Sequence, residues 1–96
     1  MYLCVMYDIS SQRRLQKIAR LCTQAGLARI QKSVFIGELD TEEVIAFREI
    51  VLRTLVRKED RLLMLPLERH NLKKSIDLGL SSGVRELLEN KPLLFV

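Results

Sequence analysis

The chain begins with an apolar run that ends abruptly in a carboxylate, over residues 1–8 (MYLCVMYD). The run is too short for a buried helix and is rich in bulky and aromatic side chains, so it predicts a strand. Alternate side chains of a strand point to opposite faces, and both sets are apolar here: Leu3, Val5 and Tyr7 on one face, Tyr2, Cys4 and Met6 on the other. Such a strand needs cover on both sides. We expect helices on one face, and in a chain of 96 residues a second copy is a candidate for the other.

The carboxylate of Asp8 falls at the carboxyl end of this strand. Ligand and catalytic groups of α/β sheets tend to lie at the carboxyl ends of strands, so Asp8 is a candidate metal ligand. The alternative is structural, because an aspartate after a strand often caps the turn that follows.

The net charge of +4 is unevenly spread along the chain. Residues 1–37 carry six basic side chains and one acid, Asp8, whereas residues 38–96 carry ten basic and eleven acidic side chains. The whole excess therefore belongs to the unit that contains Asp8. A basic field around one carboxylate suits a polyanionic ligand, and a solvated basic helix face is the alternative.

Composition indicates one compact domain, since 48% of the residues are apolar and the chain is long enough for a single core. Cys4 and Cys22 both fall on predicted apolar faces, so we expect two unpaired, buried thiols. No apolar run has the length of a membrane span and the first residues lack a secretory signal pattern, so we expect a cytoplasmic protein without a membrane partner.

The first helix is predicted to begin after Ser10 or Ser11, which are candidate N-caps, and to end at Gly26. Its apolar positions recur at helical spacing, at Leu15, Ile18, Ala19, Cys22 and Ala25. Residues 27–37 then alternate between apolar and polar side chains, which predicts one half-buried strand.

A second helix is predicted from the capping-box pair Asp40 and Glu43 to about Arg57. Residues 62–67 form another run that is apolar on both faces and should be the second central strand, with Pro66 near its end.

The remainder of the chain has weaker signals. Residues 72–78 resemble an edge strand, residues 79–83 a loop, and residues 84–89 a short helical turn. The last four residues, 93–96, are apolar and are expected to add a strand to a sheet edge, in this copy or in a partner.

Together these elements predict an α/β protein of the α+β sandwich type. Residues 1–96 form a single ferredoxin-like βαββαβ domain: a four-stranded antiparallel sheet of order 4-1-3-2 with two helices on one face. Residues 82–96 form a tail whose terminal strand pairs at the dimer. The second face of the sheet is left open and exposes Tyr2, Cys4 and Met6, so the fold predicts a homodimer.

Two segments, residues 2–9 (YLCVMYDI) and residues 29–39 (RIQKSVFIGEL), resemble the most recognisable blocks of the small CRISPR-associated adaptation protein family. The resemblance covers about two thirds of the chain. The family has a ferredoxin-like fold, works beside the CRISPR integrase in spacer acquisition and was first described as a metal-dependent endonuclease.

The resemblance implies a two-fold dimer in which Asp8 of each subunit contributes to one site for Mg²⁺ or Mn²⁺. Two acids, waters and a phosphate oxygen complete an octahedral oxygen shell, and the metal polarises a phosphodiester of DNA or RNA. The expected phosphate-binding residues are Arg13, Arg14, Lys17 and Arg29, and the expected supporting residues are Tyr7, Ser33 and Phe35. Phe35 is expected to pack in the protein in preference to stacking on a base.

Three functions remain open from the sequence. The first is a homodimeric, metal-dependent nuclease of spacer acquisition. The second is a non-catalytic scaffold that holds duplex DNA and bridges integrase subunits. The third is a ferredoxin-like domain that binds a small molecule, and the basic first unit argues against it. The single histidine, His70, is expected to be a surface residue.

Overall fold

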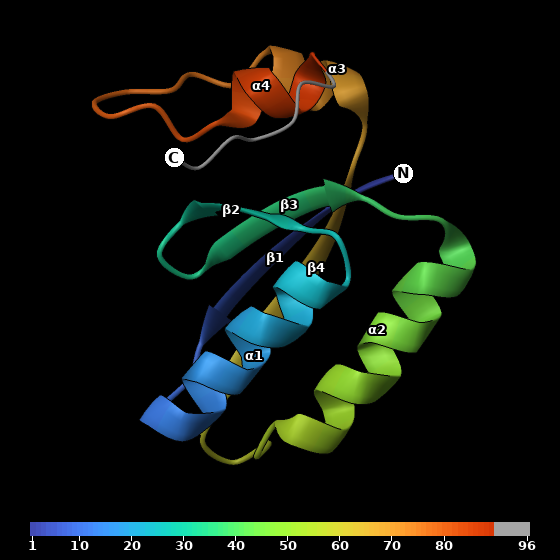
Figure 1. The fold of residues 1–96 in the computed structure, drawn as a ribbon, viewed down its shortest axis with the longest axis vertical. Coiled ribbons are helices and arrows are strands. Elements are labelled where there is room, and N and C mark those ends of the chain that lie inside the picture. The colour runs from blue at the N-terminus through green and yellow to red at the C-terminus, as the bar shows by residue number, and fades with distance from the viewer. Residues whose placement is uncertain (90–96) are drawn as a thin grey trace.

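The computed structural model describes residues 1–89, so the predicted terminal strand at residues 93–96 lies outside the described residues. The elements in chain order are β1 (Tyr2–Asp8), α1 (Gln12–Gln24), β2 (Ala28–Gln31), β3 (Val34–Glu38), α2 (Thr41–Thr54), β4 (Arg61–Leu67), α3 (Arg69–Lys73) and α4 (Val84–Leu88). The strands form one antiparallel sheet of order β2-β3-β1-β4. Helices α1 and α2 lie side by side along this sheet (Figure 1). The predicted ferredoxin-like fold is confirmed. Numbered along the chain, the observed strand order reads 4-1-3-2, but the third and fourth strands are β3 and β4, whereas the sequence analysis placed them at residues 62–67 and 72–78.

Both long helices begin where the sequence places their caps. Ser11 Oγ accepts a hydrogen bond from the backbone N–H of Arg14 at 3.3 Å, so Ser11 and not Ser10 is the N-cap of α1. Asp40 and Glu43 form the reciprocal capping box of α2, with hydrogen bonds of 2.8 and 3.0 Å. Helix α2 ends at Thr54, three residues before the predicted end.

Residues 27–37 form a hairpin, and the prediction of one continuous strand is wrong. Strands β2 and β3 are joined by a turn at Lys32 and Ser33, and the register pairs Ala28 with Ile36 and Arg29 with Phe35. Paired residues share a face of the sheet. Because each of these pairs joins two even or two odd positions, the alternation of apolar residues continues across the turn, and the sequence therefore resembles a single strand.

Strand β4 lies at an edge of the sheet, and the prediction that residues 62–67 form a central strand is wrong. The central strands are β1 and β3. An edge position explains Pro66, because a proline on an edge strand removes no interior ladder hydrogen bond. It also explains why Leu63 and Leu65 are 54% and 41% exposed.

Between the sheet and helices α1 and α2 lies the main core. Its most deeply buried side chains are Leu3, Val5, Ile18, Cys22 and Phe35. Burial of an aliphatic or aromatic side chain of this size contributes roughly 1.5–3 kcal/mol to the free energy of unfolding. Cys4 and Cys22 are both unpaired and buried, as predicted.

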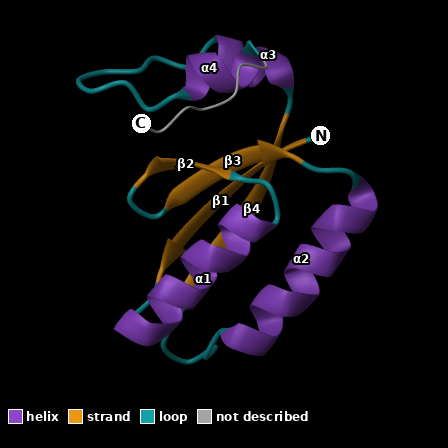
Figure 2. Ribbon diagram, in the orientation of Figure 1, coloured by secondary structure: helices purple, strands orange, loops and turns teal. Residues whose placement is uncertain are grey.

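The other face of the sheet is covered by the chain itself, so the prediction of an open face is wrong for Tyr2 and Cys4. Leu72 of α3 and Val84 of α4 pack with Tyr2, Cys4 and Ile36 in a second buried cluster. Helices α3 and α4 lie close together on the side of the sheet opposite α1 and α2 (Figure 2).

Arg69 of α3 connects helices α3 and α4 to strand β1 through hydrogen bonds. One of its guanidinium nitrogens donates to the Tyr2 hydroxyl at 3.3 Å and the other to the carbonyl of Leu88.

The prediction of an edge strand at residues 72–78 is wrong, because its first two residues belong to α3 and the rest is irregular. The predicted helical turn at residues 84–89 is confirmed by α4.

No helix within residues 1–89 combines the length and the hydropathy that a membrane span requires.

Candidate functional site

Asp8 is the last residue of β1, and its side chain is exposed. Its neighbour across the sheet is Arg61, the first residue of β4. Within residues 1–89 the Asp8 carboxylate has no hydrogen-bond or ion-pair partner. The carboxylate therefore has its full capacity to accept hydrogen bonds or to bind a cation.

The segment after Asp8 is held by a buried acid, Asp60, which the sequence analysis did not single out. Asp60 Oδ1 accepts from the backbone N–H of Ser10 at 3.3 Å, and Asp60 Oδ2 accepts from the backbone N–H of Val56 at 2.9 Å. Arg14 binds both oxygens, through Nε at 2.7 Å and Nη2 at 3.2 Å. Asp60 thus connects the segment after β1 and the first turn of α1 to the loop between α2 and β4.

These contacts favour the charged form of Asp60. The hydrogen bond from Arg14 is the largest cause, and together with the bonds from the Val56 and Ser10 backbone it outweighs desolvation and lowers the pKa of Asp60 to about 2. No sequence signal marks this residue, because its partners lie 4 to 50 positions away along the chain.

Arg14 has a structural role in this arrangement. Besides Asp60, its guanidinium binds the exposed Glu59 at 2.9 Å. The prediction that Arg14 holds a phosphate stays a prediction, and such a contact would compete with two carboxylates that already bind the guanidinium.

Arg13 and Lys17 differ from Arg14 in their surroundings. Both are exposed on α1 and neither forms an ion pair with any residue of the described range 1–89. The first turn of α1 contains no acidic residue. These two cations are therefore free to bind an anion near the start of the helix.

Arg29, Phe35 and Tyr7 form a cluster beside the sheet. The Arg29 guanidinium carbon lies 5.0 Å from the centre of the Phe35 ring, and the Phe35 and Tyr7 rings are stacked with centroids 6.3 Å apart. Phe35 is only 2% exposed, so it packs in the core as predicted and has no free face for a base.

Tyr7 and Ser33 place the end of β1 relative to the hairpin. The backbone N–H of Tyr7 donates to the carbonyl of Ser33 at 3.1 Å. Burial raises the pKa of the Tyr7 hydroxyl, and the Arg29 guanidinium partly offsets that rise. This hydroxyl oxygen is buried and, although the Arg29 guanidinium is nearby, no group within residues 1–89 has hydrogen-bond geometry toward it.

Candidate metal ligands are not clustered in the described part of the chain. Within the described residues no group of three or more His, Cys, Asp or Glu side chains is close enough to hold an ion. His70 is a surface residue, as predicted, with its side chain 61% exposed and 3.4 Å from Glu68.

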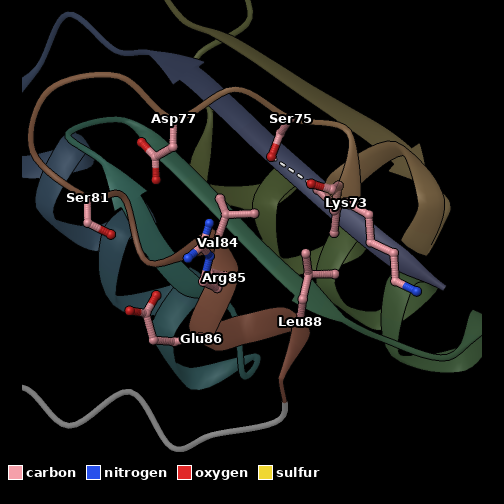
Figure 3. Close-up of a pocket in the computed structure, with 9 residues that line it drawn as sticks. Lys73, Ser75, Asp77, Ser81, Val84, Arg85, Glu86 and Leu88 are labelled. Atoms are coloured by element: carbon pink, nitrogen blue, oxygen red, sulfur yellow. Dashed lines mark hydrogen bonds between the residues drawn. The ribbon is translucent and has the colours of Figure 1, made fainter.

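A hollow of about 370 Å³ lies in the C-terminal part of the structure, between α3, α4 and the loop that joins them. It is lined by charges of both signs, Lys73 and Arg85 with Asp77 and Glu86 (Figure 3). This mixture favours no particular ligand charge.

The structure thus defines a class: a small ferredoxin-like protein with an unpaired acid at the end of a central strand and free cations on the adjacent helix. The sequence profile of the family described as CRISPR associated protein Cas2 matches residues 1–75. The chain therefore belongs to the Cas2 family. The match contains Asp8 and all of the predicted site residues, and it ends before α4.

Two relatives share the family's sequence features. A CRISPR-associated endoribonuclease Cas2 of Korarchaeum cryptofilum is 36% identical over 75 residues, which is 78% of this chain and 81% of the relative. A CRISPR-associated endoribonuclease Cas2 2 of Chloroflexus aurantiacus is 44% identical over 50 residues, 51% of this chain and 59% of the relative.

Two solved structures share the fold. Cas2 of Streptococcus pyogenes superposes with a TM-score of 0.74 at 25% identity, covering 82% of this chain and 100% of that one. A hypothetical protein of Thermus thermophilus superposes with a TM-score of 0.72 at 29% identity, covering 83% and 92%. The predicted resemblance to the CRISPR adaptation family is confirmed.

Proposed function

We propose that this protein is a CRISPR nuclease that hydrolyses phosphodiester bonds in nucleic acid, as a homodimer that uses one Asp8 from each subunit. The observation that carries the proposal is the free, exposed Asp8 carboxylate at the end of a central strand. The relatives are named endoribonucleases, which favours RNA as the substrate.

Asp8 has suitable chemistry for a divalent cation, because carboxylate oxygen is a preferred ligand of Mg²⁺ and Mn²⁺. One chain contributes too few ligands within residues 1–89, so Asp8 of a second copy would complete the protein's part of the shell. When bound, the cation would polarise the scissile phosphate and activate a water.

The substrate backbone would be held by Arg13, Lys17 and Arg29. The first two are exposed cations without ion pairs in the described part of the chain, and they lie in the first two turns of α1, the helix that follows Asp8. Arg14 is left out of this surface, because Asp60 and Glu59 hold its guanidinium. Phosphate contacts of this kind tolerate different sequences and weaken with salt.

The dimer would form on the part of the second sheet face that α3 and α4 leave uncovered. Leu63 and Leu65 of β4 are directly opposite Met6 and Cys4, so their side chains share that face. Both leucines are exposed. Apolar side chains gathered on an uncovered sheet face are typical of a surface that binds a second copy.

The test is a nuclease assay with single-stranded RNA and double-stranded DNA, in Mg²⁺ and in EDTA, for the wild type and Asp8→Asn. Glu38→Gln is the matched control, because Glu38 is also an exposed acid at the end of a central strand but lies at the opposite end of the sheet. Activity that needs Mg²⁺, survives in Glu38→Gln and vanishes in Asp8→Asn supports the proposal. Activity that persists in Asp8→Asn contradicts it.

A second candidate is a non-catalytic scaffold that holds DNA and bridges subunits of the CRISPR integrase. The observation that favours it is the sparse set of ionisable groups at the site, since within residues 1–89 Asp8 belongs to no group of three or more His, Cys, Asp or Glu side chains that could supply both metal ligands and a general base. A wild type that is inert with Mg²⁺ and Mn²⁺, yet binds duplex DNA and the integrase, would support this candidate.

A further inference from the structure

A groove runs between α1 and the β2–β3 hairpin. It consists of two hollows, of about 400 Å³ and about 680 Å³, that share the residues Ala19, Arg20 and Arg29 and are therefore adjacent. Each hollow has the size of a small-molecule ligand site in proteins. We call the two together the α1–β2 groove.

One end of the α1–β2 groove is basic. Arg20, Arg29 and Lys32 line it, and no Asp or Glu lines either hollow. Within residues 1–89 none of these three cations has a carboxylate partner. Cations that the protein itself leaves unpaired favour an anionic ligand.

A buried hydroxyl lines the same basic end. Tyr7 is 7% exposed, and although the Arg29 guanidinium is near enough to its hydroxyl to lower the pKa, no group in the described part of the chain has hydrogen-bond geometry toward that hydroxyl. Buried polar groups are normally satisfied, and an exception calls for a specific explanation. An acceptor oxygen from a ligand, placed between this hydroxyl and the Arg29 guanidinium, would satisfy both.

The other end of the groove is largely apolar. Besides Ala19, Arg20 and Arg29, which line both hollows, its walls include Leu27, Ala28 and Phe35. Phe35 lies beneath the Arg29 guanidinium. A ligand that matches the whole groove therefore has an anionic part and a flat, largely apolar part. A nucleotide has both.

We infer that the α1–β2 groove binds an unpaired nucleotide of a single-stranded nucleic acid. The phosphate lies at the basic end, near Tyr7 Oη, Arg29 and Lys32, and the base enters the apolar end beside Ala19. A base paired within a duplex is stacked and cannot enter, so the groove selects single strands. This inference rests on the proposed function, because it specifies the substrate class of that nuclease.

The experiment measures binding of labelled single-stranded RNA, single-stranded DNA and duplex of one sequence to the full chain in EDTA, so that no cleavage occurs. Three variants address the groove. Ala19→Phe fills the groove where the two hollows meet, Tyr7→Phe removes only the hydroxyl, and Lys32→Gln removes one cation. Lys58→Gln is the matched control, because Lys58 is an exposed turn lysine far from the groove in sequence.

We expect Ala19→Phe to abolish the preference for single strands and Tyr7→Phe to weaken their binding by about tenfold, the usual effect of one hydrogen bond to a charged group. Lys32→Gln should reduce the salt slope for single strands by about 0.7, whereas Lys58→Gln leaves it unchanged. Comparison of RNA with DNA shows which single strand the groove prefers.

Equal binding of single strands by the wild type and all three variants, with native circular dichroism, would overturn the inference. So would an equal loss of duplex binding in each variant. Lys32 is exposed, so Lys32→Gln should fold even if Ala19→Phe does not, and it then tests the inference by itself. The proposed function can fail separately, because an Asp8→Asn protein that still cleaves RNA leaves the groove measurements untouched.

Discussion

Arg14 Nε donates a hydrogen bond of 2.7 Å to Asp60 Oδ2, and this contact joins the first turn of α1 to the residue that precedes β4. Asp8 and Arg61, which pair across the sheet, each lie next to one of the joined segments. The ion pair therefore fixes the backbone around the proposed catalytic acid without touching its carboxylate.

The first prediction concerns pH. The pKa of Asp60 is lowered to about 2 in the folded protein from 3.8, so its contribution to stability is present above pH 3.8 and is lost as the pH falls toward 2. The free energy of unfolding should decrease over that interval. Urea unfolding at several pH values should show a smaller decrease for Asp60→Asn than for the wild type. The exposed control Glu49→Gln should follow the wild-type curve, and an unchanged decrease in Asp60→Asn would contradict this assignment.

The second prediction separates two adjacent arginines. Arg14→Ala should lower the midpoint of thermal unfolding, because Asp60 loses its strongest partner and stays buried. Arg13→Ala should leave the midpoint within a degree or so of the wild type and reduce the salt slope of duplex DNA binding by about 0.9, the effect of one lost phosphate contact. Differential scanning fluorimetry and a salt titration measure the two effects. The opposite pattern would place the phosphate contact at Arg14.

The helix caps of α1 and α2 and the strand β1 could be predicted because they depend on neighbours in sequence. Asp60 could not, since an acid in a turn has no local feature that reveals an arginine 46 positions away. The sequence does not reveal the hairpin at Lys32, because the pairs Ala28–Ile36 and Arg29–Phe35 each join two even or two odd positions. The alternation of apolar and polar residues therefore continues across the turn as it would in one strand.

The cover on the second face was missed for a related reason. Leu72 is the one apolar residue of α3, and Val84 lies in α4 with Leu87 and Leu88, but each helix has only five residues, too few turns to indicate which part of the sheet it covers. Their burial arises from contact with Tyr2 and Cys4 at the other end of the chain. Asp8 itself was identified from the sequence, because its position at the end of an apolar strand is a local feature.

The third prediction tests this cover. Leu72 is 5% exposed, so Leu72→Ala should lower the free energy of unfolding by roughly 2–5 kcal/mol, the usual cost of such a truncation in a core. Ile76→Ala is the control, since Ile76 is 83% exposed and should change stability by less than about 0.5 kcal/mol. Chemical unfolding measures both. Equal, small effects would mean that α3 does not pack on the sheet in solution.

The fourth prediction concerns the dimer. Leu63→Asp and Leu65→Asp place a charge on the uncovered part of the second sheet face and should shift the protein from dimer to monomer. Ile45→Asp, on an exposed position of α2 that is 54% exposed, should leave the dimer intact. Sedimentation equilibrium at micromolar concentration distinguishes the two masses. A wild type that sediments only at 11.1 kDa would refute the homodimer itself.

The last prediction concerns the metal and depends on Asp8 alone. Asp8→Asn keeps the shape of the side chain and removes one negative charge from each subunit, so the affinity for Mg²⁺ and Mn²⁺ should collapse while the dimer persists. Loss of metal activation removes several kcal/mol of transition-state stabilisation, which corresponds to a rate at least about 1000-fold lower. Titration calorimetry with Mn²⁺ and single-turnover cleavage measure the two effects, with Glu38→Gln as the matched control. Metal binding that survives in Asp8→Asn, or is lost equally in Glu38→Gln, would show that the metal site is not at the end of β1. Asp8 would then have no role in metal binding, as the scaffold candidate requires.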